Sequence, residues 1–326
     1  MNTLCRAEKA TDTPQKGFHT IALRLPLRLA DILFISAMVL AALPGKRTMA
    51  FEYRGYLMGL LGLIELLYWL HQTMHKEPVR KKSSGDIAAV MFTGIIVWEL
   101  MTSHLDLLQH LLFPVPGKVV AVFISELPVF ARCLVSSLGL LGAGYLLALI
   151  TAIPLALIIG WRKRLFAAVN PLTKVLGPIP PIVYIPYAIV ILPTFKCASI
   201  FIIFIGAFWP IFIGTLNATF NVDRHLIDSA RVLNVSEKTM LFEIILPGIM
   251  PAIISGATLG LVFSFILLTA AEMIGASSGL GWYVKYFSDF ADYPRVVAGI
   301  LFIGCVVTAI TGCFERVERR LLSWKN

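Results

Sequence analysis

Long apolar stretches separated by short polar ones make up most of this chain. Their approximate bounds are 29–43, 56–70, 87–101, 134–160, 179–192, 198–216, 253–271 and 296–312. Most of these stretches approach the roughly twenty residues that a helix needs to cross the hydrocarbon core of a bilayer. The pattern therefore predicts an all-α, polytopic membrane protein with about eight membrane helices.

One polar segment, residues 217–247, interrupts this pattern, and it must emerge into water. Its first half carries an apolar stripe at helical spacing, formed by Leu226, Ala230 and Leu233. Asn234 follows where a residue in the left-handed conformation would end a helix. Ser236 can cap a second helix, which Pro247 is expected to stop. We therefore expect two short helices joined by a tight corner.

The same segment resembles the EAA loop of the inner-membrane permeases of bacterial ABC importers, which starts with Glu-Ala-Ala, continues to a Gly and ends in Ile-x-Leu-Pro. The matching positions are Asp228, Ser229, Ala230, Asn234, Ile244, Leu246 and Pro247. Asp228 replaces the family's Glu and keeps the carboxylate, and Ser229 replaces Ala and stays small. Asn234 replaces Gly, and Asn is the second choice after Gly in the left-handed conformation.

Two further stretches resemble the nitrate, sulfonate, taurine and bicarbonate subfamily of these permeases. Residues 271–282 read AEMIGASSGLGW, as in that subfamily, and residues 318–324 read ERRLLSW, close to its ERRLLRW ending. The likeness extends over roughly residues 85–326. It implies the type I permease fold of ABC importers with about two additional helices in front of it.

The resemblance also implies a division of the chain. Residues 1–82 are expected to form an N-terminal extension with about two membrane helices. Residues 83–326 then form the permease transmembrane domain, which contains the cytoplasmic coupling loop, residues 217–247.

By this resemblance the chain is a permease of the bacterial inner membrane that forms the translocation path for a small anion, such as nitrate, bicarbonate or a sulfonate like taurine. The implied partners are a dimer of cytoplasmic ATPase subunits, a second permease subunit, identical or homologous, and a periplasmic or lipid-anchored substrate-binding protein. ATP and Mg would be bound by the ATPase, so no cofactor is expected in this chain.

The net charge of +9 does not indicate a nucleic-acid partner, because the basic residues fall in short loops between apolar stretches. Such loops lie on the cytoplasmic side of membrane proteins. One region departs from this pattern: Lys46, Arg47 and Arg54 would lie outside if the first two apolar stretches both cross. The sequence contains no phosphate-binding loop, no His-Glu-x-x-His and no Gly-x-Ser-x-Gly, so no enzyme class is indicated.

The residues expected to couple the permease to its ATPase are Asp228, Ser229, Ala230, Asn234, Val235, Ser236, Leu246 and Pro247. A helix, a corner and a second helix would give the ATPase a projection to grip, and its movement would switch the pore between inward and outward access. For this segment taken alone, an ordinary solvated loop is the alternative.

Glu272 ends a long apolar stretch and precedes a break rich in Gly and Ser. A carboxylate at that depth is costly unless it faces the interior of the bundle. It either lines or supports a gate, or it reaches the outer interface or caps local backbone amides. The small residues after it would let backbone amides approach an anion, or would let helices pack closely. The candidate path or gate residues are Glu272, Gly275, Ser277, Ser278 and Gly279.

Other interpretations stay open. An ABC permease for a non-anionic small metabolite fits the same motifs. An ion-coupled secondary transporter would need intramembrane ionisable residues, which are few in this chain. His71 and His75 have the spacing of two metal ligands on one helical face, but they lack a third ligand nearby.

Overall fold

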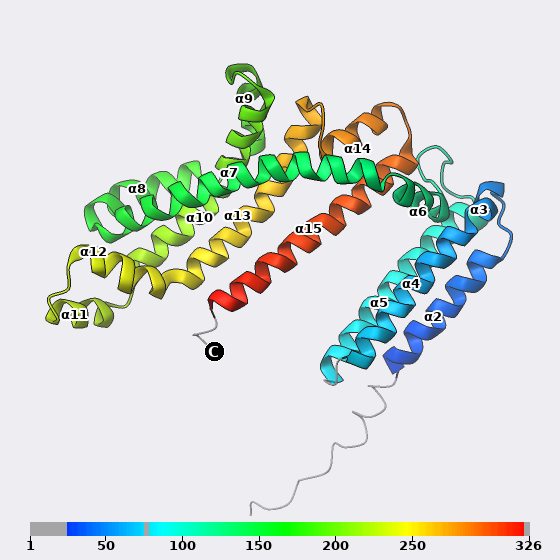
Figure 1. Cartoon of the computed structure of the whole chain (residues 1–326), viewed down its shortest axis with the longest axis horizontal. Helices are drawn as coiled ribbons and strands as arrows, with labels where there is room; N and C mark the ends of the chain where they lie inside the picture. The colour runs from blue at the N-terminus through cyan, green and yellow to red at the C-terminus, as the bar shows by residue number, and fades with distance from the viewer. Residues whose placement is uncertain (1–24, 75–77, 323–326) are drawn as a thin grey trace, which may run out of the picture. The chain divides into compact units, whose positions relative to one another are not determined.

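The computed structural model describes residues 25–74 and 78–322, which form helices and connecting loops without any strand (Figure 1). The α-helices are α2 Leu25–Ala42, α3 Thr48–Glu52, α4 Arg54–Met74, α5 Pro78–Glu99, α6 Pro116–Ser125, α7 Leu127–Trp161, α8 Lys163–Leu176, α9 Ile185–Ile191, α10 Phe195–Phe220, α11 Arg224–Val232, α12 Glu237–Thr239, α13 Leu246–Gly275, α14 Leu280–Asp289 and α15 Tyr293–Leu321. Shorter turns are the 3₁₀ turn Pro181–Tyr184 and the π-helical turns Leu100–His104 and Met240–Ile245.

The chain divides into two compact units, Met1–Ile124 and Ser125–Asn326. In the first unit, α2, α4 and α5 lie side by side and bury an apolar core that includes Ala30, Leu61 and Phe92 (Figure 1). The division predicted from the family likeness, 1–82 and 83–326, falls inside α5. This predicted division marks where the resemblance to the permease family begins, not which helices pack together. It stays a prediction.

The centre of the second unit is the packing of α10 between α7 and α13. Glycines allow these helices to approach closely. At Gly144 of α7, a side chain would collide with Ile203 of α10, and at Gly256 of α13 it would lie 2.9 Å from the Pro210 carbonyl oxygen of α10. Because lipid tails are as apolar as these side chains, such close packing takes the role that the hydrophobic effect has in water.

Five helical runs are long and apolar enough to cross a membrane, among the residues that the structure describes. They are Lys81–His104, Leu127–Trp161, Phe195–Phe220, Glu237–Gly275 and Tyr293–Arg320. The helix pair Lys163–Leu176 and Pro181–Ile191, bent by 78°, makes a sixth span if it is counted as one. The bend lies in a segment that contains Pro178, Pro180 and Pro181, and proline interrupts a helix.

Length and apolarity therefore select five or six of the about eight predicted crossings among the described residues. The apolar stretches 29–43 and 56–70 form α2 and α4, which are not among these candidate spans. In α4, Glu65, His71 and Gln72 interrupt or follow the apolar residues.

Candidate functional site

The polar segment between α10 and α13 contains the predicted helix, corner and second helix. The Asp223 side chain caps α11 by accepting a hydrogen bond from the His225 N–H at 2.9 Å. Asn234 has a φ of 54°, which confirms the predicted left-handed corner. The Ser236 hydroxyl accepts a hydrogen bond from the Thr239 N–H at 3.2 Å, which confirms the predicted cap of the second helix.

The predicted apolar stripe was only partly right. Ala230 is buried, but Leu226 and Leu233 are 52% and 77% exposed. Because α11 ends at Val232, Leu233 lies beyond the helix and does not share its face. The packed side of the segment is instead formed around Ala230 with Ile227 and Val235, which contact the cluster of Leu157, Met240, Ile245, Ile249 and Ile253.

Pro247 does not stop the second helix, and that prediction was wrong. The chain stays helical from Glu237 to Gly275, through the π-helical turn Met240–Ile245 and into α13, where Pro247 is in the first turn. Proline lacks an N–H and its ring conflicts with the carbonyl four residues earlier in an α-helix. Here a π-helical turn directly precedes it, in which the Leu246 N–H bonds to the Leu241 carbonyl, five residues earlier instead of four. The short second helix is thus continuous with a membrane span.

The outward side of the segment is largely exposed. Asp228 and Ser229 lie on it, and Asp228 forms a surface ion pair with Arg231, at 3.7 Å. Exposed apolar side chains accompany them: Leu226, Val232, Leu233 and Phe242. Trp161 at the end of α7 donates a hydrogen bond to Glu237 at 3.1 Å and ties the second helix to the bundle. A projecting segment with clustered exposed apolar side chains is typical of a protein interface.

The Glu272 carboxylate is enclosed in the second unit, with 1% of the residue exposed. The Ser137 hydroxyl of α7 donates to Glu272 Oε1 at 2.6 Å, and the Gly281 N–H donates to Oε2 at 2.7 Å. The Leu280 N–H in turn donates to Ser137 Oγ at 2.9 Å. Side chains from α13 and α7 therefore satisfy two N–H groups in the first turn of α14, where a negative charge is also favoured by the helix dipole.

Gly279 lies directly against this carboxylate. Its φ is 128°, a conformation that favours glycine, and a side chain added there would collide with Glu272 Oε1. Gly275 is less constrained, because an added Cβ would lie 3.2 Å from the Phe195 ring. The stretch is thus shaped around the buried carboxylate of Glu272.

The structure divides the five candidate path residues into two groups. Glu272 and Gly279 are buried together, whereas Gly275, Ser277 and Ser278 are exposed, and Ser278 Oγ lies 2.9 Å from Ser136 Oγ. Of the alternatives for Glu272, the carboxylate does not reach an interface but does cap local amides. Sequence reasoning missed Ser137, although two adjacent serines in an otherwise apolar stretch could have drawn attention to it.

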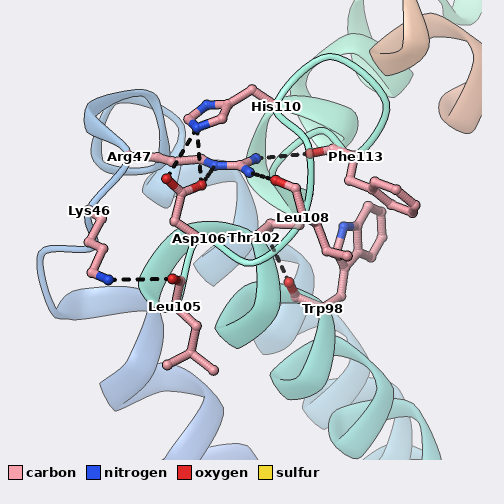
Figure 2. A network of polar contacts seen from close by, with 9 residues as sticks. All are labelled: Lys46, Arg47, Trp98, Thr102, Leu105, Asp106, Leu108, His110 and Phe113. Atoms are coloured by element: carbon pink, nitrogen blue, oxygen red, sulfur yellow. Dashed lines mark hydrogen bonds and ion pairs between the residues drawn. The ribbon is translucent and has the colours of Figure 1, made fainter.

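A second polar network lies in the first unit, around the buried Arg47 (Figure 2). Its Nε donates to Asp106 Oδ1 at 2.7 Å, and its two terminal nitrogens donate to the carbonyls of Phe113, at 3.0 Å, and Leu108. His110 also contacts the Asp106 carboxylate. The hydrogen bond from Arg47 holds the pKa of Asp106 below its ordinary value, with a smaller contribution from His110. Arg47 departs from the loop charge pattern because it binds the 105–113 loop.

No metal site was found in the described ranges, since no group of three His, Cys, Asp or Glu residues comes together there. His71 lies in α4, and His75 lies outside the described residues.

Comparison with known proteins identifies one matching family and two similar permeases. Residues 144–323 match the model described as the binding-protein-dependent transport system inner membrane component. The putative aliphatic sulfonates transport permease protein of Bacillus subtilis is 29% identical over 261 residues, which cover 78% of this chain and 93% of that protein. The nitrate import permease protein of Leptolyngbya laminosa is 31% identical over 171 residues, which cover 52% and 61%.

Among solved structures, an inward-facing MetNI methionine ABC transporter is similar, with a TM-score of 0.52 and 18% identity, over 60% of this chain and 98% of that one. At that identity the likeness shows the fold alone. The segment matched by the family model includes the exposed helix–corner–helix and Glu272, but not Ser137.

Proposed function

This chain belongs to the family of binding-protein-dependent transport system inner membrane components, and from that premise we propose that it forms the translocation path of an ATP-driven importer for small oxyanions. The observation that carries the proposal is the family match over residues 144–323, together with relatives named for sulfonate and nitrate transport. Nitrate and sulfonates share delocalised negative charge on oxygen atoms, so one kind of path can serve both.

The proposed assembly needs three kinds of partner. The chain contains no phosphate-binding loop, so a pair of cytoplasmic ATPase subunits has to bind ATP and Mg. A second permease subunit completes the path, and an external binding protein delivers the substrate. The location that follows is the bacterial inner membrane, with the segment between α10 and α13 on the cytoplasmic side.

Coupling is assigned to the helix–corner–helix that this segment forms. Asp228 and Ser229 are on its exposed side, Asn234 sets the corner, and Ser236 caps the second helix, while the buried Ala230 and half-buried Val235 hold it to the bundle. Leu246 and Pro247 lie where the second helix passes into α13. The helical continuity from Glu237 to Gly275 supports this role, because a displacement of the exposed end would move a membrane span with it.

In this proposal the residues at the end of α13 and in the turn after it have two roles. The exposed Ser277 and Ser278 face the path, where their hydroxyls can donate hydrogen bonds to an anion. Glu272, Gly275 and Gly279 position the turn behind them, because the carboxylate anchors the start of α14 and the glycines allow the close approach.

Uptake by the complete transporter tests the proposed function. The chain, its ATPase and its binding protein would be reconstituted in proteoliposomes and supplied with ATP. We expect uptake of labelled nitrate or taurine that requires ATP and the binding protein. Labelled methionine serves as the matched non-anionic substrate. ATP-dependent uptake of methionine without uptake of either anion would contradict the proposed substrate class.

A further inference from the structure

A surface hollow of about 610 Å³ lies between α8 and α10 in the second unit. Its lining consists of Asn170, Thr173, Lys174, Gly177, Pro178, Ile213 and Asn217. Two contacts hold the helices together beside it. The rings of Phe166 and Phe220 stack with centroids 3.7 Å apart, and a side chain at Gly177 would collide with the Ile213 side chain. The volume is within the range of ordinary small-molecule sites, roughly 300–1,000 Å³.

The helices that form this hollow come from a part of the chain without carboxylates. From Leu127 to Val222 there is no Asp or Glu, while the basic residues are Arg132, Arg162, Lys163, Arg164, Lys174 and Lys196. Lys174 forms no ion pair with any residue in the described ranges. Arg162 is paired with Glu237, but an anion in the hollow meets Lys174 and no acidic side chain among the lining residues.

The neighbouring polar groups suit an oxyanion. Asn170 and Lys174 are four residues apart and share a face of α8, and Asn217 reaches the same hollow from α10. Each Asn side chain has an NH₂ group with two donors, and the Lys ammonium has three. Together they can donate several hydrogen bonds to the oxygens of one anion, with the ammonium supplying the charge.

A structural role explains only part of this arrangement. A lysine in the last turn of a helix is favoured by the helix dipole, and this accounts for Lys174 at the end of α8. It does not account for the two asparagines on different helices that line the same hollow. We propose that the α8–α10 hollow is a binding subsite for a small oxyanion of the nitrate or sulfonate class. This inference rests on the proposed function and places its substrate at named residues.

Protection of an introduced cysteine tests the subsite directly. Ile213→Cys places a thiol in the lining without removing a polar group. Cys5 and the exposed Cys197, Cys305 and Cys313 would be changed to Ser, and Cys133 is buried, so that a maleimide reports on position 213. Labelling would be followed in vesicles of phosphatidylcholine that contain the full chain with its ATPase, with nitrate or ethanesulfonate added at constant ionic strength against chloride.

We expect either oxyanion to slow labelling in a saturable way. Lys174→Gln should raise the half-protecting concentration roughly tenfold, as expected from loss of a hydrogen bond to a charged group. Lys174→Arg should preserve protection. Lys196→Gln removes a positive charge from the same segment but outside the hollow, and it should leave protection unchanged.

Two results would overturn the inference. One is a labelling rate that the oxyanions do not change, or that they change equally in the Lys174→Gln variant. The other is protection that depends only on adding an anionic phospholipid to the vesicles, which would make a lipid headgroup the occupant. Because the labelling needs neither ATP nor a binding protein, its result is independent of whether the complete transporter imports anions.

Discussion

Individual buried polar residues have their partners on other helices. Glu272 would be an unfavourable residue in an apolar bundle if it were unpaired. Its oxygens accept hydrogen bonds from Ser137 and from the Gly281 N–H, and the Ser137 hydroxyl also accepts one from the Leu280 N–H. Removing the carboxylate would leave a buried hydroxyl and a buried N–H without an acceptor, which costs about 1–3 kcal/mol for each group. The carboxylate is therefore required to hold the turn between α13 and α14.

Gly279→Ala tests how closely the turn between α13 and α14 packs against the Glu272 carboxylate. The added methyl would collide with Glu272 Oε1, and the φ of 128° is strained for alanine. We expect the free energy of unfolding to fall by about 2–4 kcal/mol, from strain and overpacking together. Thermal denaturation of the detergent-purified chain would measure this as a lower Tm.

The matched control is Gly142→Ala in α7, where an added methyl meets no atom within 4 Å. That variant should be as stable as the unsubstituted chain or slightly more stable, because alanine favours a helix. If both variants melt at the same temperature, the turn around Glu272 is not packed as described.

At the scale of elements, the exposed helix–corner–helix combines local and long-range features. Caps at Asp223 and Ser236 define its two helix starts, and the left-handed Asn234 defines the angle between them. The second helix then continues through a π-helical turn into α13. π-helical turns inside longer helices often occur at functional sites, because they change the direction of side chains locally. The corner and the span consequently form one connected unit.

Asn234→Val is expected to uncouple transport from ATP hydrolysis. The left-handed conformation costs a non-glycine residue about 1–2 kcal/mol, and a β-branched side chain is among the least tolerant of it. The corner should open while membrane insertion is retained. The measurement is anion uptake per ATP hydrolysed in proteoliposomes.

Asn234→Gly is the control, because glycine adopts this conformation without a steric cost, and its coupling should equal that of the unsubstituted chain. Equal uptake per ATP in the Val variant would argue against the corner as a coupling element.

At the scale of the whole molecule, the two compact units raise the question of how separable the N-terminal segment is. The buried face of α5, with Ala88, Ala89 and Phe92, packs against α2 and α4. If these helices are removed in a membrane, that face meets lipid tails that are equally apolar, so little is lost by its exposure. The loss of Arg47 has a larger effect, because the 105–113 loop depends on it for three hydrogen bonds.

A chain that begins at Ser83 should therefore insert and still bind the ATPase, but with a loosened 105–113 loop. Limited proteolysis should show faster cleavage in that loop, and Arg47→Met in the full chain should reproduce the effect. Arg54→Met, which removes an exposed arginine from the same unit, should not. If the shortened chain inserts but no longer copurifies with the ATPase, the N-terminal segment belongs to the coupling machinery and the proposed division at residues 82 and 83 is wrong.

The sequence by itself determined the features that depend on nearby residues. The all-α membrane character follows from the length and apolarity of single stretches. The left-handed Asn234 and the cap at Ser236 follow from interactions within a few residues. These features were predictable because their energies are local.

Only the tertiary structure decided the features that join distant segments. Ser137 meets Glu272 across 135 positions, and Arg47 meets Asp106 across 59. The continuity of the helix through Pro247 and the outward side of α11 likewise depend on what the bundle packs against. A buried charged residue requires a partner, but the sequence around that residue does not say which distant helix supplies the partner. That choice is made when the helices pack, because burial and hydrogen bonding are then satisfied together.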